Sequence, residues 1–242
     1  MIIIPARIAS NRFANKVLAD INGTPMVIAT AKRVERLDEV AIATDSEKVL
    51  EVAKRYGFRA VMTRSDHNSG TDRINEAADI LGLKEDEIVV NVQADEPFIE
   101  ESVVKKVIDR VRKAKSDKEE VLMVSCYKKI PPSFADDPNH VKVVVDHKNY
   151  ALYFSRSKIP YDREEHLEYF GHLGIYGFVR SNLRKFCSLP PAPLEEIEKL
   201  EQLRALYFGL KIAMVEVESE SFGIDTPHDL ERALKYFKDR NV

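Results

Sequence analysis

The sequence predicts an α/β protein built on a mostly parallel sheet with helices on both faces, and two observations support this fold class. Short apolar runs alternate with segments of helical period through the first half of the chain. The runs are apolar at successive positions, which is typical of parallel strands buried on both faces. Since 242 residues with 44% apolar composition can bury one sizeable core, we expect a single α/β domain over residues 1–242.

In the first half, apolar runs are predicted as strands and the segments between them as crossover helices. The predicted strands cover residues 2–4, 40–43, 59–62, 88–92 and 121–126. The predicted helices lie within residues 26–37, 49–56 and 74–81, where apolar side chains recur near every 3.6 residues. This order is the β-α-β-α layout of a parallel sheet.

The pattern changes after Lys128, where paired prolines precede a β-branched run and an aromatic-rich stretch. We interpret about 128–190 as a β-rich insertion. A helix is predicted over 195–208, a strand over 212–217 and a closing helix over 227–237. For the closing helix we expect the following start: Thr226 as N-cap, Pro227 as first helical residue and Asp229 as capping-box acid.

Composition excludes several classes of protein. The net charge of -3 argues against a broad nucleic-acid surface. No apolar run is long enough to span a bilayer, and the apolar start is too short for a signal peptide, so we expect a cytoplasmic protein without a membrane partner. Cys126 and Cys187 lie far apart without a metal-binding pattern, so we expect both to be packing residues.

The loop after the first strand is a candidate phosphate site. It carries the cations Arg7, Arg12 and Lys16 together with Ser10. Ligands of open α/β sheets bind at the carboxyl ends of strands, where this loop begins. Because the loop lacks a glycine-rich phosphate motif, side-chain cations would replace backbone amides as anion ligands. From these residues alone, a phosphate clamp and a solvated loop remain equally open.

Residues 69–73 open the helix predicted to continue through residue 81, with Thr71 or Asp72 as its N-cap. The positive charge of Arg73 then lies at the positive end of the helix dipole. This costs roughly 0.3–1 kcal/mol, which a nearby anion would offset. The alternative, slightly favoured by the residues alone, is a salt bridge to an acid close in sequence: Asp66, Asp72 or Glu76.

Two acids follow apolar runs and are candidate magnesium ligands. Asp95 comes after the strand at 88–92 and just before Glu96-Pro97. Asp225 is not needed as the N-cap of the next helix, because Thr226 is predicted to fill that position, so Asp225 can serve another role. Mg²⁺ usually takes only one or two carboxylates, and phosphate and water complete its octahedron. Spacing alone does not bring the two acids together, and an Asx-turn is the alternative role of Asp225.

The ordered segments resemble the CMP-Kdo synthetase family, the 3-deoxy-manno-octulosonate (Kdo) cytidylyltransferases, over nearly the whole chain. The matching segments are Ile4-Pro5-Ala6-Arg7 with Ser10, Arg12 and Lys16; Ala43-Thr44-Asp45; Ser69-Gly70-Thr71 with Arg73; Asn91-Val92-Gln93 with Asp95-Glu96-Pro97; Ala151 to Arg156; His172 to Tyr176; Leu200 to Arg204; and Gly223 to Pro227. Any one of them is weak evidence, and the aromatic stretch around His172 establishes no function by itself, but the ordered set is specific.

The resemblance implies a Rossmann-like fold of the nucleotide-diphospho-sugar transferase type. It implies transfer of CMP from CTP to the anomeric hydroxyl of Kdo, with release of pyrophosphate, for lipopolysaccharide synthesis. It also implies magnesium as cofactor and a homodimer, with the insertion at about 128–190 contributing sugar-site residues and dimer contacts. The nearest alternatives are a cytidylyltransferase for another sugar acid, such as sialic acid, and a non-catalytic nucleotide-sugar sensor.

The resemblance also assigns roles to individual residues. Nucleotide binding falls to Ala6, Arg7, Ser10, Lys16, Ser69, Arg73, Gln93 and Asp95, and sugar binding to Gln93, Arg156, His172, Tyr176, Glu201 and Gln202. Catalysis falls to Arg7, Lys16, Asp95 and Asp225, of which the two acids hold the metal. Arg156 is the natural partner for the sugar carboxylate.

Two positions depart from the family pattern. Phe13-Ala14-Asn15 stands where the family usually has Leu-Pro-Gly, and Ala94 stands where it has glycine before the metal-binding aspartate. Asparagine tolerates a left-handed backbone, so we expect Asn15 to preserve the turn. Alanine does not adopt positive φ cheaply, so we expect an ordinary backbone at Ala94.

Overall fold

The computed structural model describes residues 1–9, 13–164 and 168–238. The chain folds into two compact units: Met1–Lys105 with Ser219–Val242 form the first, and Lys106–Glu218 form the second. That residues 1–242 make a single domain stays a prediction. Within the described residues, no helix combines the length and the apolar character needed to cross a membrane.

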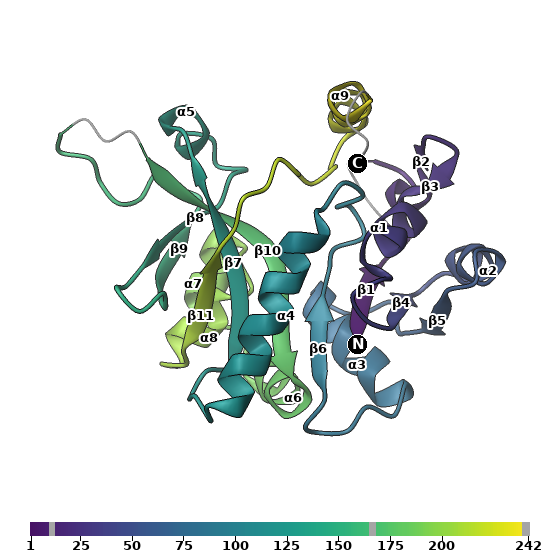
Figure 1. Ribbon diagram of the computed structural model, residues 1–242, viewed down its shortest axis with the longest axis horizontal. Coiled ribbons are helices and arrows are strands. Elements are labelled where there is room, and N and C mark those ends of the chain that lie inside the picture. The colour runs from purple at the N-terminus through teal and green to yellow at the C-terminus, as the bar shows by residue number, and fades with distance from the viewer. Residues whose placement is uncertain (10–12, 165–167, 239–242) are drawn as a thin grey trace. The chain divides into compact units, whose positions relative to one another are not determined.

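Parallel strands form the sheet of the first unit, in the order β6 (Ile88–Asn91), β1 (Ile2–Ala6), β4 (Val40–Thr44) and β5 (Arg59–Met62) (Figure 1). Ile2 pairs with Val40 on one side and with Val90 on the other. Every residue of β1 is buried, as expected for a central strand that is apolar on both faces. The predicted strands of this half are confirmed.

The crossover helices of the first unit are α1 (Met26–Val34), α2 (Glu47–Arg55) and α3 (Gly70–Ile80), as the periodicity predicts. A short hairpin of β2 (Asp20–Ile21) and β3 (Thr24–Pro25) precedes α1. Helix α3 packs on β1, and α2 packs on β5. The helices thus cover the sheet and leave the carboxyl ends of its strands to the loops.

The start of α3 differs from the prediction. Ser69, not Thr71 or Asp72, is the N-cap, because its Oγ accepts a hydrogen bond from the backbone N–H of Asp72 at 3.1 Å. Thr71 is fully buried in the first turn and is not placed to cap. Ser69 and Asp72 also share a side-chain hydrogen bond of 2.9 Å, which ties the cap to the first turn.

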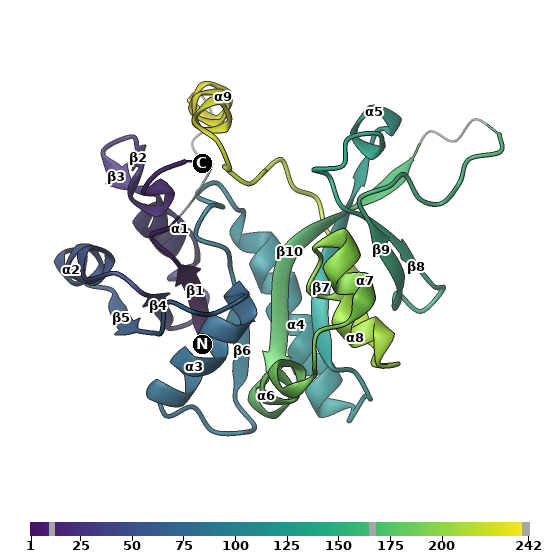
Figure 2. The same cartoon turned by 180° about the vertical axis from the view of Figure 1, so that it is seen from behind.

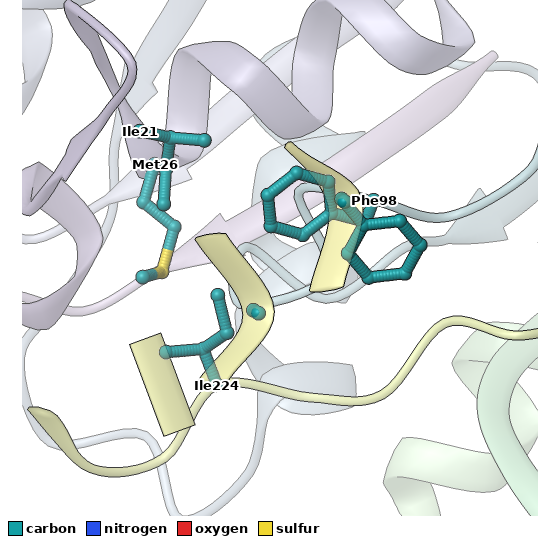
Figure 3. Packing of buried hydrophobic residues seen from close by; sticks show 6 residues of the cluster. Ile21, Met26, Phe98 and Ile224 are labelled. Carbon is teal, nitrogen blue, oxygen red and sulfur yellow. The ribbon is translucent and has the colours of Figure 1, made fainter. Parts of the chain in front are cut away.

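Helix α9 (Pro227–Phe237) packs on the rest of the first unit through an apolar cluster (Figure 3). The cluster consists of Ile21, Met26, Phe98, Ile224, Ala233 and Phe237. The rings of Phe98 and Phe237 stack with centroids 4.4 Å apart. Thr226 caps the helix with Asp229 in a capping box and Pro227 in the first turn, so the predicted start is confirmed. The cluster brings residue 224, and with it Asp225, back to the sheet.

The sheet of the second unit is mixed. Strand β7 (Met123–Ile130) lies parallel to β11 (Ile212–Glu216). On its other side β7 pairs antiparallel with the long β10 (Tyr169–Val179), which lies beside it in Figure 2. Strand β8 (Lys142–Val145) pairs antiparallel with β10 and with β9 (Ala151–Ser155). The region from about 128 to 190 therefore holds antiparallel strands, while its predicted share in the sugar site and the dimer stays a prediction.

The helices of this part of the chain differ most from the expectation. They are α4 (Glu101–Ser116), whose first turn belongs to the first unit, α5 (Pro132–Ala135), α6 (Arg180–Ser188), α7 (Pro193–Glu198) and α8 (Leu203–Tyr207). The prediction of one helix over 195–208 is wrong. Lys199 adopts a left-handed backbone with φ 52° and ψ 48°, which ends α7 before α8 begins.

Candidate active site

A pocket of about 470 Å³ lies in the first unit and is lined by residues that follow its strands. The lining includes Arg7 and Lys16 after β1, residues 67–70 at the start of α3, residues 93–95 after β6, and Asp225 before α9. Open parallel sheets bind ligands at this edge, where the carboxyl ends of the strands meet. Ser10, predicted to bind the nucleotide, lies outside the described residues.

Lys16 joins the two acids that the sequence leaves far apart. Its Nζ donates to Asp95 Oδ2 at 2.5 Å and to Asp225 Oδ1 at 2.9 Å. The backbone contributes as well, since the N–H of Ile224 donates to the carbonyl of Asp95 at 3.0 Å. The predicted approach of Asp95 and Asp225 is therefore present in the structure, with one cation between them.

The charge of Lys16 is secured by these contacts. Burial favours the neutral amine, but attraction and hydrogen bonds from Asp95 and Asp225 outweigh it and raise the pKa of Lys16. The Lys16 side chain is only 14% exposed, so the ammonium is largely shielded from water. The site thus holds a permanent positive charge between two carboxylates.

The backbone before Lys16 explains how the loop reaches this position. Asn15 has φ 53° and ψ 31°, a left-handed conformation, and it precedes a short 3₁₀ helix, Lys16–Leu18. Val17 is buried and anchors that helix. The expectation that Asn15 preserves the turn is confirmed. Ala94 is not among the described residues with positive φ, which confirms the second expectation.

Arg73 forms a buried ion pair with an acid that sequence reasoning did not select. Its Nη2 donates to Asp45 Oδ2 at 2.9 Å, and its Nη1 donates to Thr63 Oγ1 at 2.6 Å and to the carbonyl of Arg64 at 3.2 Å. The predicted partners Asp66, Asp72 and Glu76 were wrong, because the guanidinium turns toward the ends of β4 and β5 rather than along its own helix. Asp45 also accepts the N–H of Ile8 at 3.0 Å.

Gly70 allows the pocket wall to close tightly. A Cβ built on Gly70 would lie 3.2 Å from Pro5 Cγ and 3.6 Å from Gln93 Oε1. A larger residue would therefore press on the end of β1 and on a side chain that lines the pocket. Ala6, predicted to bind the nucleotide, has a fully buried side chain at the end of β1, and its role stays a prediction.

His67 lines the same pocket, although the sequence analysis did not select it. Its Nε2 makes a short contact with Glu76 Oε2, and its side chain is 6% exposed. Glu76 also accepts the N–H of Arg64 at 3.0 Å. The signal available in the sequence was a histidine two residues before the helix cap with a glutamate nine residues later, which is too common a pattern to select.

The predicted sugar-binding residues lie in the second unit, apart from Gln93, and several of them share a buried hydrogen-bond network. His172 Nε2 contacts Ser125 Oγ at 2.8 Å, and its Nδ1 lies 3.4 Å from Gln202 Nε2. Tyr176 donates its hydroxyl to Gln202 Oε1 at 3.1 Å. Burial lowers the pKa of His172 to about 3, so the ring is neutral. The structure thus brings His172, Tyr176 and Gln202 together.

Arg156, the predicted partner of the sugar carboxylate, donates hydrogen bonds to backbone carbonyls. Its guanidinium donates to Glu198 O at 2.8 Å and to Pro138 O at 3.0 Å. The Glu198 carboxylate accepts the backbone N–H of Arg156 at 2.9 Å, which fixes the end of β9 against α7. Glu201 is half-buried in the turn between α7 and α8, next to Gln202.

The residues of the first unit fit a magnesium ion that arrives with a nucleotide. No group of three or more histidine, cysteine, aspartate or glutamate side chains in the described ranges could hold a metal by itself. Asp95 and Asp225 nevertheless direct carboxylate oxygens at one cation, the Lys16 ammonium. Two hard oxygen donors are what Mg²⁺ takes from a protein when phosphate and water complete its shell.

Comparisons with known sequences point to one family. The family described as Cytidylyltransferase matches residues 1–212. A 3-deoxy-manno-octulosonate cytidylyltransferase from a Nitratiruptor species is 60% identical and covers 96% of this chain and 97% of its own length. The enzyme of that name from Wolinella succinogenes is 51% identical and covers 99% of this chain and 100% of its own length.

Solved structures extend the comparison. CMP:2-keto-3-deoxy-manno-octonic acid synthetase complexed with CTP superposes with a TM-score of 0.89 at 38% identity, over 98% of this chain and 97% of the other. A cytidylyltransferase from Leptospira borgpetersenii matches with a TM-score of 0.63 at 19% identity, over 98% of this chain and 86% of the other, which shows the fold alone. The predicted α/β fold class is confirmed.

Proposed function

The chain belongs to the family of 3-deoxy-manno-octulosonate cytidylyltransferases, and from this premise we infer that it transfers CMP from CTP to the anomeric hydroxyl of Kdo. The hydroxyl oxygen forms a bond to the α-phosphorus, the bond from that phosphorus to the bridging oxygen breaks, and pyrophosphate leaves. The hydroxyl proton is lost to solvent or to an acceptor in the site. The products are CMP-Kdo and pyrophosphate, as lipopolysaccharide synthesis requires.

One observation carries the assignment of this chemistry to the pocket: Lys16, Asp95 and Asp225 converge although they come from three distant segments. We propose that Asp95 and Asp225 hold Mg²⁺ when the nucleotide binds. Bound magnesium supplies Lewis-acid polarisation of phosphate oxygens. Until then the Lys16 ammonium offsets part of the negative charge of the two acids.

The cations of the pocket stabilise the charge that develops on the leaving group. Arg7 and Lys16 both line the pocket, and Lys16 keeps its charge because of its acidic partners. Charges that are already held in place stabilise a transition state without having to reorganise. Asp45 holds Arg73, so we propose that Arg73 contributes its charge to the pocket while it anchors the wall.

We propose that the buried network of the second unit binds Kdo. His172 is neutral and Tyr176 has its pKa raised well above the usual value by burial, so both act as hydrogen-bond partners for sugar hydroxyls rather than as charges. Arg156 and Glu201 complete the set that the family resemblance implies. A cytoplasmic homodimer is part of the same proposal, and light scattering of the purified protein tests the dimer.

A pyrophosphate-release assay tests the proposed function. We expect release with CTP, Kdo and Mg²⁺ together, and none when either substrate is omitted. Faster release with N-acetylneuraminate than with Kdo would instead identify a cytidylyltransferase for sialic acid. Binding of CTP and Kdo without any release would identify a non-catalytic sensor and would contradict the proposal.

A further inference from the structure

His67 and Glu76 form a pair at the pocket wall that the reaction described above does not use. His67 lies in the segment between β5 and α3, and Glu76 lies on α3, two turns into the helix. Their contact joins His67 Nε2 to Glu76 Oε2, and the His67 side chain is only 6% exposed. The ring is therefore held in one orientation while it lines the pocket.

Glu76 determines which ring nitrogen carries the hydrogen. Burial opposes ionisation of Glu76, but hydrogen bonds from His67 and from the N–H of Arg64 lower its pKa, so the carboxylate is charged and acts only as an acceptor. His67 Nε2 must then be the donor. In the neutral ring, the hydrogen on Nε2 leaves Nδ1 with a lone pair, which makes Nδ1 an acceptor.

The acceptor at Nδ1 contrasts with the three cationic side chains of the pocket wall. Arg7, Lys16 and Arg73 present only donors, which suit phosphate oxygens. Among the residues that the structure describes, none hydrogen-bonds to Nδ1 of His67, so this atom is available to a ligand. A nucleoside triphosphate offers few donors, and the 4-amino group of cytosine is the donor that uracil lacks, since uracil has a carbonyl oxygen there.

We propose that His67, oriented by Glu76, is a specificity residue that accepts a hydrogen bond from the 4-amino group of cytosine. The inference rests on the proposed cytidylyltransferase function and names the residue that selects its nucleotide. A uracil base would place its carbonyl oxygen against the Nδ1 lone pair, and two facing acceptors repel. Sites that hydrogen-bond a distinguishing group reject analogues that lack it, because a buried polar group is left unpaired.

A competing explanation is that His67 is protonated and binds phosphate. The charged groups around the ring bear on this explanation. Glu76 faces the ring from α3, and Arg64 faces Glu76 from the segment after β5, 4.0 Å from Arg64 Nε to Glu76 Oε2. Asp66 forms an ion pair with Arg64, in which Asp66 Oδ1 lies 3.5 Å from Arg64 Nε. A phosphate-binding His67 would contribute equally to every nucleoside triphosphate, so the identity of the base separates the two explanations.

The first test compares kcat/KM for CTP and UTP in the pyrophosphate-release assay with Kdo. In His67→Phe, which keeps the ring shape without nitrogens, we expect kcat/KM for CTP to fall about tenfold or more and that for UTP to change less than about threefold. Glu76→Ala should also lower the ratio of kcat/KM for CTP to kcat/KM for UTP, because Glu76 then no longer determines which ring nitrogen of His67 carries the hydrogen. The exposed His147→Phe is the matched control and should leave both values unchanged.

Equal losses for CTP and UTP, or an unchanged ratio, would overturn the inference. Absence of pyrophosphate release by the wild-type protein with CTP and Kdo would contradict the proposed function itself, so the two failures are distinguishable. Because His67→Phe leaves Glu76 without its partner and could unfold the wall, a second measurement uses the wild-type protein.

The second test is ¹⁵N NMR of the histidine rings of the wild-type protein. We expect His67 to carry its hydrogen on Nε2, and its Nδ1 resonance to shift on addition of CTP or cytidine but not of inorganic triphosphate. A hydrogen on Nδ1 in the free protein, or the same shift with inorganic triphosphate as with CTP, would overturn the inference.

Discussion

Replacing Asp45 with alanine tests the claim that a buried ion pair holds the pocket wall. Asp45 and Arg73 are 8% and 3% exposed, so the substitution leaves a guanidinium buried without its counter-charge. Removing one partner of a buried pair costs about 3–5 kcal/mol. The lost acceptor for the N–H of Ile8 adds about 1 kcal/mol.

The expected loss of about 4–6 kcal/mol is a large fraction of the stability of a typical domain, about 5–15 kcal/mol. Urea unfolding at 25 °C measures it as a lower midpoint with an unchanged slope. Asp45→Asn keeps an oxygen for Ile8 and should lose less. Asp117→Ala, which removes an exposed partner of Lys113, is the matched control and should leave the midpoint unchanged.

Asp45→Asn should also bind CTP more weakly, because it removes the negative charge that holds the Arg73 guanidinium, and Arg73 lines the pocket. We expect KM for CTP to rise about tenfold in Asp45→Asn while kcat changes less, which marks a positioning role. A loss of stability below about 1 kcal/mol in Asp45→Ala, together with an unchanged KM in Asp45→Asn, would refute the reasoning.

Three further predictions follow from the backbone, the pKa values and the packing. Asn15→Gly should keep the stability of the protein, whereas Asn15→Ala should lower the free energy of unfolding by about 1 kcal/mol, because alanine pays for the left-handed backbone; equal values for the two variants in urea unfolding would contradict this. The pKa of His172 is about 3 in the folded state against an ordinary 6.5, so only the unfolded state binds this proton between those values. Stability should therefore fall as pH falls from 6.5 toward 3, with a His172 contribution of up to about 1.4 kcal/mol per pH unit that is absent in His172→Gln; parallel pH profiles of the two proteins would count against it. Gly177→Ala would place a Cβ 2.5 Å from Val111 Cγ2, so the free energy of unfolding should fall by about 1–3 kcal/mol. A variant as stable as the wild type would show that α4 can move away without loss of stability.

Features set by neighbouring residues were predictable from the sequence. The β1 run is apolar at each of its first positions, and the structure buries it on both faces. The start of α9 was also predictable, because Thr226, Pro227 and Asp229 satisfy the helix terminus among themselves. Asn15 belongs to the same group, since its left-handed backbone depends on the residue type more than on distant contacts.

Features set by distant contacts were not predictable in the same way. Arg73 forms its ion pair with Asp45, 28 residues away, and not with the acids on or near its own helix. The reason is that the parallel strands bring the end of β4 to the first turn of α3. Helical periodicity continued across Lys199, yet the chain breaks there. Helix α4 was missed although Val103, Val107 and Val111 recur at helical spacing, so in that case the signal was present and overlooked.

The proposed role of His67 was only partly predictable from the sequence. Its type and its place before the α3 cap are visible in the sequence, but only the fold places it in the pocket with Glu76 on one ring nitrogen. The convergence of Asp95 and Asp225 likewise depends on the hydrogen bond from Ile224 to Asp95, which no spacing reveals.

Magnesium-dependent pyrophosphate release by Asp225→Asn is the most direct test of the central claim that acids from distant segments act on one nucleotide. The substitution keeps the size of the side chain and an oxygen for Lys16, so the thermal unfolding midpoint should stay close to that of the wild type. We expect turnover with CTP and Kdo to fall by about 10²–10⁴-fold, while the exposed control Asp20→Asn retains full activity. Near-normal, magnesium-dependent release by Asp225→Asn would remove this residue from the chemistry and contradict the account.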